Sequence, residues 1–275
     1  KYVKFTISGR VQRLSYASIS ISMSLSAAMT APVSPSSVPL LSVVVPVYNE
    51  ADNVGPLAGE IAAALDGLAG GYEMVFVDDA STDATVAALA GLALETLRVV
   101  RHVRNCGQSA AVASGFRAAR GAWVATLDGD GQNDPADLPA MLARARAENA
   151  DCVTGVRRRR RDTWLRRFSS RVANGFRNAI TGDRISDSGC GARVVRREAL
   201  AEIPVFNGMH RFLPTLLRGQ GFTVLEQEVN HRERVRGVSK YGVHNRLWRG
   251  IRDCFGIRWY LQRAVPARRL GDESR

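Results

Sequence analysis

Ala122-Trp-Val-Ala-Thr-Leu-Asp128-Gly-Asp130-Gly-Gln132-Asn-Asp134-Pro135 is the stretch from which the fold can be inferred. Its apolar run, residues 123–127, has the length of a buried strand and is too short for a helix. The glycines and the proline that follow predict the end of that strand. If the backbone stays extended past the run, Asp128, Asp130 and Gln132 point to the same side. Three oxygen-bearing side chains on one face predict a site for a hard divalent cation, Mg²⁺ or Mn²⁺.

Two other interpretations compete with a metal site at this stretch. An EF-hand loop also begins Asp-x-Asp, but it needs Gly at its sixth position and Glu at its twelfth, where this chain has Asn133 and Pro139. A solvated acidic turn without any ligand stays open on these residues alone, because short motifs often match by chance. Other parts of the chain must therefore distinguish a metal site from a bare turn.

Composition sets broad limits on the class of protein. The 275 residues are enough for one large α/β domain with a sizeable core. The net charge of +12 predicts an anionic partner, which could be a nucleotide, a lipid phosphate, a membrane surface or a nucleic acid. The four cysteines are scattered without a C-x-x-C pair, which disfavours a zinc site or disulfide scaffold and indicates a reducing compartment. No apolar run reaches the roughly 18 residues of a membrane-spanning helix.

Residues 1–39 are predicted to be a disordered or non-native extension that does not belong to the fold. Basic residues precede a Ser/Ala stretch at 15–28, which loosely resembles a signal or transit peptide, but serines interrupt the apolar part. A Pro/Ser-rich linker at 31–39 then separates this segment from the rest.

Apolar runs and helical periodicities alternate along the remainder of the chain. The predicted strands are residues 40–46, 72–77, 97–100, 123–127, 152–155, 194–195 and 222–231. The predicted helices are residues 53–68, 84–94, 108–120, 135–148, 198–201, 210–219 and 241–263. This alternation predicts an α/β fold with a mostly parallel sheet.

Polar clusters follow three of the predicted strands, at residues 46–50, 78–79 and 128–132. Ligands of parallel sheets bind beyond the carboxyl ends of the strands, so these clusters are expected to converge on one site. The glycine motif of dinucleotide-binding folds does not follow the first strand, and the phosphate-binding loop motif is also absent from the sequence. A nucleotide would therefore be bound by another arrangement.

Two regions in the second half of the chain are rich in arginine. Residues 157–177 contain an unbroken arginine run, 157–161, and then arginines interleaved with aromatic and aliphatic residues. This pattern predicts a basic amphipathic helix on an anionic membrane surface, with a solvated basic face or a nucleic-acid-binding arm as alternatives. Residues 241–263 carry Trp and Tyr among arginines, which is typical of either a core helix or an interfacial anchor.

From about Leu40 to Trp259 the chain resembles family 2 glycosyltransferases of the GT-A fold. Within that family it is similar to the polyprenyl-phosphate glycosyltransferases, which include dolichyl-phosphate mannose synthases. The motifs that carry the resemblance are Pro46-Val-Tyr-Asn-Glu50, Val77-Asp-Asp-Ala-Ser-Thr-Asp83, Asn105-Cys-Gly-Gln, Asp128-Gly-Asp-Gly-Gln-Asn-Asp-Pro135, Asp187-Ser-Gly-Cys-Gly and Arg234-Val-Arg-Gly-Val-Ser-Lys240.

The resemblance implies a Rossmann-like, mostly parallel sheet flanked by helices, with C-terminal amphipathic helices. It places a GT-A catalytic domain at residues 40–242 and a membrane-interface helix with a basic tail at 243–275. The implied reaction is the inverting, metal-dependent transfer of a sugar from a nucleoside-diphosphate sugar to a polyprenyl phosphate, either dolichyl or undecaprenyl. The metal would be Mg²⁺ or Mn²⁺.

The resemblance also implies roles for individual residues. Those implied to bind the nucleotide are Pro46, Tyr48, Glu50, Asp78 and Asp128. Those implied to hold the metal are Asp128, Asp130 and Gln132. Those implied to contact the acceptor phosphate are Arg157, Arg171 and Ser239. Those implied to act in catalysis, by stabilising the departing diphosphate, are Asp130, Arg234 and Lys240.

A phosphate acceptor is already an anion, so it needs no general base, whereas Asp187 could serve as a base for a neutral hydroxyl. The lone histidines His210 and His231 are expected to be structural. The expected partners are the two substrates and a membrane surface, with a separate membrane-anchoring subunit as a further candidate and no nucleic acid. The expected location is cytoplasmic, peripheral on the inner face of the membrane.

Several alternatives stay open. The chain could be a family 2 transferase acting on a different acceptor hydroxyl, or a basic protein that binds nucleic acid or membranes. A nucleotidyltransferase would use a similar metal and nucleotide site but would release pyrophosphate.

Overall fold

The computed structural model describes residues 38–157, 174–233 and 244–265, without the side chains of 244–249. All of these residues fall within one compact unit. Residues 1–37 of the predicted N-terminal extension, the arginine-rich segment 158–173, residues 234–243 and residues 266–275 lie outside the described residues. The predicted division between residues 40–242 and 243–275 stays a prediction.

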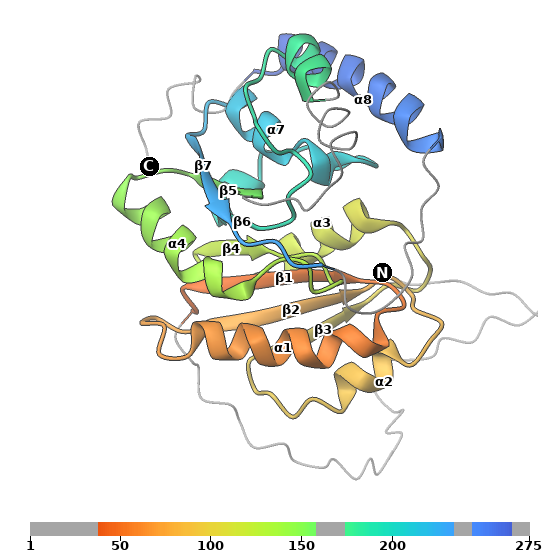
Figure 1. Cartoon of the computed structure of the whole chain (residues 1–275), viewed down its shortest axis with the longest axis vertical. Coiled ribbons are helices and arrows are strands. Elements are labelled where there is room, and N and C mark those ends of the chain that lie inside the picture. The colour runs from red at the N-terminus through yellow and green to blue at the C-terminus, as the bar shows by residue number, and fades with distance from the viewer. Residues whose placement is uncertain (1–37, 158–173, 234–243, 266–275) are drawn as a thin grey trace, which may run out of the picture. The chain divides into compact units, whose positions relative to one another are not determined.

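The described residues form a seven-stranded sheet with the order β3-β2-β1-β4-β6-β5-β7 (Figure 1). The strands are β1 Leu41–Val47, β2 Tyr72–Asp78, β3 Leu97–Arg101, β4 Trp123–Thr126, β5 Cys152–Arg157, β6 Arg193–Arg196 and β7 Val224–Val229. Four of the strand pairs are parallel: β1 with β2, β1 with β4, β2 with β3, and β5 with β7. The prediction of a mostly parallel sheet is therefore confirmed.

Strand β6 is the exception, because it runs antiparallel to both of its neighbours. Its first residue, Arg193, is paired with Thr126 on β4 and with Thr154 on β5. The start of β6 therefore lies beside the carboxyl end of β4 and the middle of β5. This register brings residues just before β6 to the edge of the sheet where ligands are expected.

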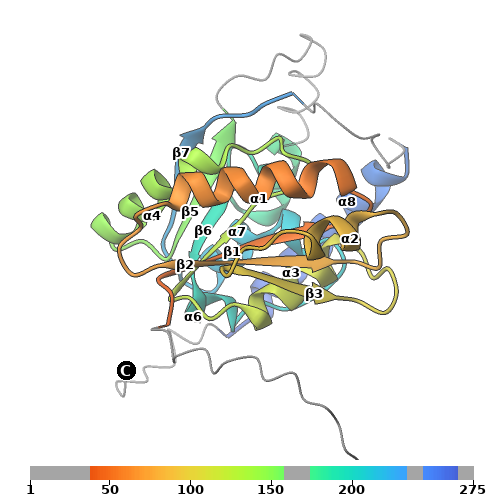
Figure 2. The ribbon, with the colours of Figure 1, turned by 90° about the horizontal axis from the view of Figure 1, so that it is seen from below.

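Helices cover both faces of the sheet, because side chains alternate along the buried strands. One core contains Val43 and Val45 of β1 and packs against α1 Ala51–Leu65, α2 Thr85–Ala90 and α4 Leu138–Ala147. The other contains Val44 of β1 and packs against α3 Gln108–Ala118, α6 Arg197–Leu200, α7 Leu213–Gly219 and α8 His244–Arg263. Figure 2 shows α1 and α3 on opposite sides of the sheet.

Several predicted elements differ from the observed ones. The predicted helix 135–148 begins as a 3-10 turn, η1 Pro135–Asp137, before α4. The predicted helix 210–219 likewise begins as η2 Met209–Arg211, and α7 starts only at Leu213. The predicted strand 222–231 is shorter, since β7 ends at Val229 and only an isolated bridge joins His231 to Asn133.

The backbone does not stay extended beyond Leu127, so the condition under which strand alternation would group Asp128, Asp130 and Gln132 is not met. The backbone turns at residues 129–130, and Gly131 adopts a positive φ of 71°. The backbone amide of Gln132 then donates to Oδ1 of Asp130, at 3.2 Å, as short acidic side chains do in turns. Asp128, Asp130 and Gln132 are therefore gathered by a tight turn and not by strand alternation.

Helix α8 packs Cys254 and Ile257 into the core, whereas Phe255 and Trp259 are 57% and 59% exposed. It is thus amphipathic, with one side in the core and aromatic side chains on the other. Among the helices of the described ranges, none combines the length and apolar character needed to cross a bilayer.

Candidate active site

A pocket of about 400 Å³ opens at the carboxyl ends of β1 and β4. Most of the described residues that the sequence singled out contribute to its lining: Pro46, Tyr48, Glu50, Asp128, Asp130, Gln132 and Arg157. The structure therefore brings together three stretches that are far apart in the chain. The other singled-out residues, Arg171, Arg234, Ser239 and Lys240, lie outside the described residues.

The loop after β1 is fixed by hydrogen bonds to the loop after β2. The backbone amide of Asn49, at a positive φ of 53°, donates to Oγ of Ser81 at 2.8 Å. The amide of Thr82 donates back to Oδ1 of Asn49 at 2.7 Å, and the amide of Glu50 donates to Oγ1 of Thr85 at 2.8 Å. These bonds hold Tyr48 and Glu50 at the pocket wall.

Of the two adjacent carboxylates at the end of β2, Asp79 is among the described residues that line the pocket and Asp78 is not. Asp78 is fully buried, accepts from the backbone amide of Ser81 at 3.2 Å and pairs with Arg101 at 3.5 Å. Asp78 thus stabilises its own loop. Its predicted contact with the nucleotide stays a prediction.

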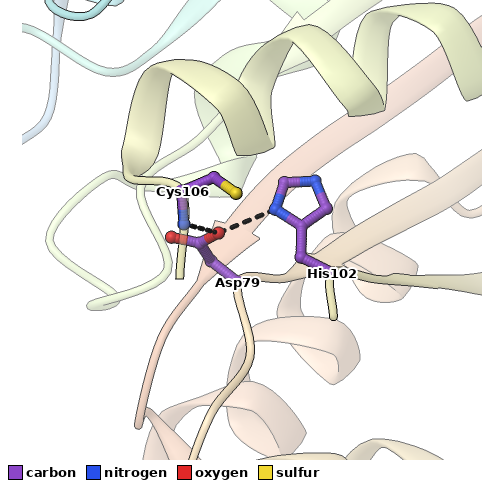
Figure 3. Close-up of side chains that lie close together, drawn as sticks. All are labelled: Asp79, His102 and Cys106. Carbon is purple, nitrogen blue, oxygen red and sulfur yellow. Dashed lines mark hydrogen bonds and ion pairs between the residues drawn. The ribbon is translucent and has the colours of Figure 1, made fainter. Parts of the chain in front are cut away.

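Asp79 fixes the loop that leads into α3 (Figure 3). Its carboxylate accepts from the backbone amides of Cys106 and Gly107, at 2.8 and 2.7 Å, and lies 2.7 Å from Nδ1 of His102. Gly107 needs its positive φ of 87° to begin the helix at this point. Asp79 thereby places Gly107 and the next residue, Gln108, at the pocket wall.

Asp79, His102 and Cys106 also lie close enough together to suggest a metal site, with one potential ligand atom from each within 4.8 Å of the others (Figure 3). Their atoms are already engaged, however. Both carboxylate oxygens of Asp79 accept backbone hydrogen bonds, and Nε2 of His102 lies 2.9 Å from Oγ of Ser114. We interpret this cluster as a structural clamp for the loop and not as a metal centre.

Asp128 is a carboxylate of the pocket wall whose contacts are well defined. Nε2 of Gln108 donates to its Oδ1 at 2.9 Å, and its backbone amide donates to Oδ1 of Asn133 at 3.0 Å. Burial and the nearby charge of Asp130 raise the pKa of Asp128 to about 6, against the opposing charges of Arg193 and Arg157. Two carboxylates held together against their repulsion are an arrangement that a cation would stabilise.

The glycine-rich turn at residues 187–191 packs directly against this carboxylate. A Cβ on Gly191 would overlap Oδ2 of Asp128 and would lie 2.9 Å from Oδ1 of Asn133. Only glycine therefore fits at this position with Asp128 in its present place.

Arg157 lies at the end of β5 and is held by Asp187 of the same turn. Its Nε and Nη2 donate to the two carboxylate oxygens of Asp187 at 2.6 and 2.7 Å. Burial lowers the pKa of Arg157, but the hydrogen bonds and the charge of Asp187 outweigh it, so the net shift is upward. The guanidinium is thus a permanent positive charge in a fixed orientation.

Four further cationic or imidazole groups line the pocket: Arg193 and Arg211, to which sequence reasoning gave no role, and His210 and His231, which it expected to be structural. Nδ1 of His210 lies 2.7 Å from Oγ of Ser109 on α3. His231 is bridged to Asn133 beside the acidic turn. Neither histidine stands in a recognisable motif, so only the folded arrangement shows their positions.

Arg232 fastens the same acidic turn to two other parts of the chain. Its backbone amide donates to the carbonyl of Gln132 at 2.9 Å. Its guanidinium pairs with Asp134 and with Glu60 of α1, both at 2.7 Å. The turn that carries Asp130 and Gln132 is therefore held from outside the pocket.

Comparison with known proteins identifies the family to which this chain belongs. The model of glycosyl transferase family 2 matches residues 42–204. Dodecaprenyl-phosphate galacturonate synthase of Rhizobium johnstonii is 38% identical over 241 residues, which cover 84% of this chain and 70% of that protein. Undecaprenyl-phosphate 4-deoxy-4-formamido-L-arabinose transferase of Aeromonas hydrophila is 37% identical over 207 residues. This second match covers 74% of this chain but only 63% of its relative.

Solved structures share the fold at lower identity. Glucosyl-3-phosphoglycerate synthase of Mycobacterium tuberculosis matches with a TM-score of 0.60 at 20% identity, over 80% of this chain and 81% of that one. A mannosyltransferase of Pyrobaculum calidifontis, solved with GDP-Man and Mn²⁺, matches with a TM-score of 0.56 at 22% identity, over 82% of this chain and 70% of that one. The sheet and its flanking helices are accordingly those of the GT-A fold. The chain belongs to glycosyl transferase family 2.

Proposed function

We propose that the protein transfers a sugar from a nucleoside-diphosphate sugar to a polyprenyl phosphate, with inversion at the anomeric carbon and with a divalent cation. The observation that carries this proposal is that one pocket is lined both by the paired carboxylates Asp128 and Asp130 and by the fixed guanidinium of Arg157. The first pair suits a metal and a diphosphate, and the arginine suits a phosphate acceptor. The names of the two relatives, which specify dodecaprenyl and undecaprenyl phosphate, support the acceptor class.

In this proposal Asp128, Asp130 and Gln132 hold Mg²⁺ or Mn²⁺. The donor set fits a hard cation, because all three side chains offer oxygen and the two acidic ones lie close enough for Asp130 to raise the pKa of Asp128. A metal bound there would neutralise charge on the diphosphate. The mannosyltransferase and glucosyl-3-phosphoglycerate synthase were solved with Mn²⁺ and a nucleotide, which supports the use of a divalent cation.

The nucleotide would lie along the ends of β1 and β2, against Pro46, Tyr48 and Glu50. The hydrogen bonds between the two loops fix these residues before the donor binds, which lowers the ordering cost of binding. Asp78 supports the wall from behind, and its direct contact with the nucleotide remains part of the proposal.

The acceptor phosphate would be bound by Arg157, with Arg171 and Ser239 as further proposed contacts. An oxygen of the phosphate attacks the anomeric carbon, the bond from that carbon to the diphosphate breaks, and the nucleoside diphosphate leaves. Arg234 and Lys240 are proposed to stabilise the leaving group electrostatically. Since both oxygens of Asp187 accept from Arg157, a reaction that needs no general base fits this pocket best.

The exposed side of α8 is proposed to contact the membrane surface. Phe255 and Trp259 are one helical turn apart and more than half exposed, and Arg263 lies over the ring of Trp259 at 5.0 Å. Nη1 of Arg258 donates to the carbonyl of Ile180 at 3.1 Å, which links α8 to a second helical stretch, residues 174–181. Aromatic rings flanked by arginines are typical of the membrane interface, so we propose that the enzyme binds peripherally to a membrane surface.

The test is an assay of nucleoside diphosphate release with a panel of sugar nucleotides, undecaprenyl phosphate and Mn²⁺. We expect release with at least one donor only when the lipid phosphate is present, and the appearance of a glycosylated lipid. Release of pyrophosphate would instead identify a nucleotidyltransferase. Transfer to undecaprenol but not to its phosphate would contradict the proposed acceptor.

A further inference from the structure

Arg193 is a buried cation in the pocket wall. It is only 5% exposed, and it begins β6 between Thr126 of β4 and Thr154 of β5. Among the described residues, Nη2 donates to the carbonyl of Ser188 at 3.2 Å, Nε has no hydrogen-bond partner, and no carboxylate forms an ion pair with the guanidinium. Arg157, in the same pocket, is by contrast neutralised by Asp187.

A buried guanidinium with so few partners is energetically unfavourable unless a ligand supplies the missing interactions. Taking a charge out of water costs several kcal/mol in general, and a single carbonyl offsets only part of that cost. Asp128 also lines the pocket, and the charge of Arg193 acts to lower its pKa, but no ion pair joins the two side chains in the described structure. The guanidinium of Arg193 is therefore available to an anionic ligand that enters the pocket.

The position of Arg193 indicates which part of a ligand it would meet. Its register places it between the strand that leads to Asp128 and the strand that ends at Arg157. It therefore lies between the carboxylates proposed to hold the metal and the arginine proposed to bind the acceptor. A guanidinium offers several donors in a planar fork, which matches the oxygens of a phosphoryl group.

We propose that Arg193 is an oxyanion-binding residue that contacts a phosphoryl oxygen between these two groups. The oxygen belongs either to the diphosphate of the donor or to the phosphate of the acceptor. This inference rests on the proposed function for the identity of the ligand, but the binding of a phosphoryl anion can be measured without any transfer.

The first test measures thermal unfolding of the full chain in EDTA, with and without inorganic phosphate and pyrophosphate. Arg193→Met keeps most of the volume and removes the charge. A buried charge without a counter-ion can be replaced by an apolar residue with little loss of stability, or with a gain. We therefore expect the Tm of the anion-free variant to be equal to or above that of wild type. Anions that bind the native state raise Tm, and this increase should be clearly smaller in the variant.

Arg196→Met is the matched control on the same strand. Arg196 pairs with Asp151 at 3.3 Å and lies over the ring of Trp123 at 4.8 Å, and it does not line the pocket. This control should lower the Tm without anion and leave the increase caused by phosphate unchanged. The two variants are thus expected to show opposite patterns.

The second test uses kinetics in the presence of Mn²⁺. We expect Arg193→Met to lower kcat/KM by about 10- to 100-fold, the size expected for one hydrogen bond to a charged group. A higher KM for the sugar nucleotide alone would assign the contact to the diphosphate, and a higher KM for the lipid phosphate alone would assign it to the acceptor. Either result supports an oxyanion contact.

The inference is overturned if wild type shows no stabilisation by phosphate or pyrophosphate, or if Arg193→Met keeps that stabilisation in full. It is also overturned if Arg193→Met fails to fold or unfolds several degrees below wild type, because the guanidinium would then be a structural group. If phosphate stabilises wild type through Arg193 but no donor is turned over, the proposed function fails while the anion site stands.

Discussion

The guanidinium of Arg157 and the carboxylate of Asp187 face each other in a double hydrogen bond of 2.6 and 2.7 Å, with side chains only 12% and 13% exposed. The backbone amide of Gly189 also donates to Asp187, at 3.2 Å. Asp187 is therefore placed to orient Arg157 and has its oxygens occupied. This geometry favours a positioning role over that of a general base.

Asp187→Asn tests this relationship. We expect the KM for the lipid phosphate to rise by about 10-fold or more, with a smaller change in the KM for the sugar nucleotide, because the orientation of Arg157 is lost. The pH dependence of kcat should keep the shape it has in wild type. Loss of its acidic limb would instead identify Asp187 as a general base.

A matched control for that experiment is Asp183→Asn. Asp183 pairs with Arg218 at 2.9 Å, is also shielded from water, and does not line the pocket. This variant should lower the Tm, as removal of a buried ion pair does, and leave both KM values unchanged.

Asp130→Asn should lower the rate of nucleoside diphosphate release by at least about 100-fold, because the diphosphate would lose the charge neutralisation of a metal. Its Tm without metal should be equal to or above that of wild type, since the repulsion with Asp128 is removed. Calorimetric titration with Mn²⁺ should show weaker binding.

Asp134→Asn is the control in the same turn, because Asp134 pairs with Arg232 and its replacement should affect metal binding far less. Full activity of wild type in excess EDTA would contradict the metal site.

Gly191→Ala should reduce activity strongly, because the new methyl group would displace the carboxylate of Asp128. The affinity for Mn²⁺ should fall together with the activity. Gly59→Ala is the control, because a Cβ there meets no atom within 4 Å and Gly59 lies inside α1. That control should stabilise the fold by up to about 1 kcal/mol and leave activity unchanged. Normal metal binding by Gly191→Ala would show that the turn can move away from Asp128.

The sequence could predict those features of the site that depend on residues close together in the chain. It could not predict the features that depend on pairing between remote segments. Apolar runs end at Glu50 and Asp128 in the sequence itself, so the convergence of these residues at one sheet edge could be predicted. The turn at 129–131 replaces the expected extension, because Gly131 and the side chain of Asp130 favour it locally. The antiparallel direction of β6 could not be predicted, and with it the position of Arg193, because it depends on pairing with strands remote in sequence.

The sequence also could not distinguish the roles of the two adjacent aspartates at the end of β2. Nothing local distinguishes Asp78 from Asp79. Their separate roles follow from Ser81 and Arg101 on one side and from Cys106 and Gly107 on the other. The contacts with Arg101, Cys106 and Gly107, which are remote in sequence, could not be read from the local pattern.

Glu73 is a buried carboxylate that should make stability depend on pH. It is 2% exposed and accepts from Oγ of Ser42 at 2.7 Å, from Nε of Arg120 at 2.8 Å and from Nη1 of Arg98 at 3.1 Å. Burial raises the pKa of Glu73, but these hydrogen bonds outweigh it and bring the pKa below its ordinary value of 4.5. The resulting stability is present above the unfolded pKa and is lost as the pH falls through the lower folded pKa.

Glu73→Gln should therefore reduce the free energy of unfolding at pH 7, by about 1–3 kcal/mol. The difference from wild type should shrink as the pH falls through the lowered folded pKa, where the wild-type carboxylate also becomes protonated. Urea unfolding at a series of pH values measures this. A difference that stays constant over the whole acid range in which the protein remains folded would mean that the charge of Glu73 is not the source of the stability.

The exposed aromatic rings of α8 lead to a prediction about membrane binding. The double change Phe255→Ser and Trp259→Ser removes both rings, while Cys254 and Ile257 on the other side of the helix still pack into the core. We expect sedimentation with vesicles that contain anionic lipids to fall by about 10-fold or more, since each ring contributes buried apolar area at the interface. Activity with a short, water-soluble polyprenyl phosphate should be retained.

Val99→Ser is the control, because Val99 is 43% exposed but lies on the edge strand β3. Unchanged vesicle binding by the double variant would show that another surface carries the contact.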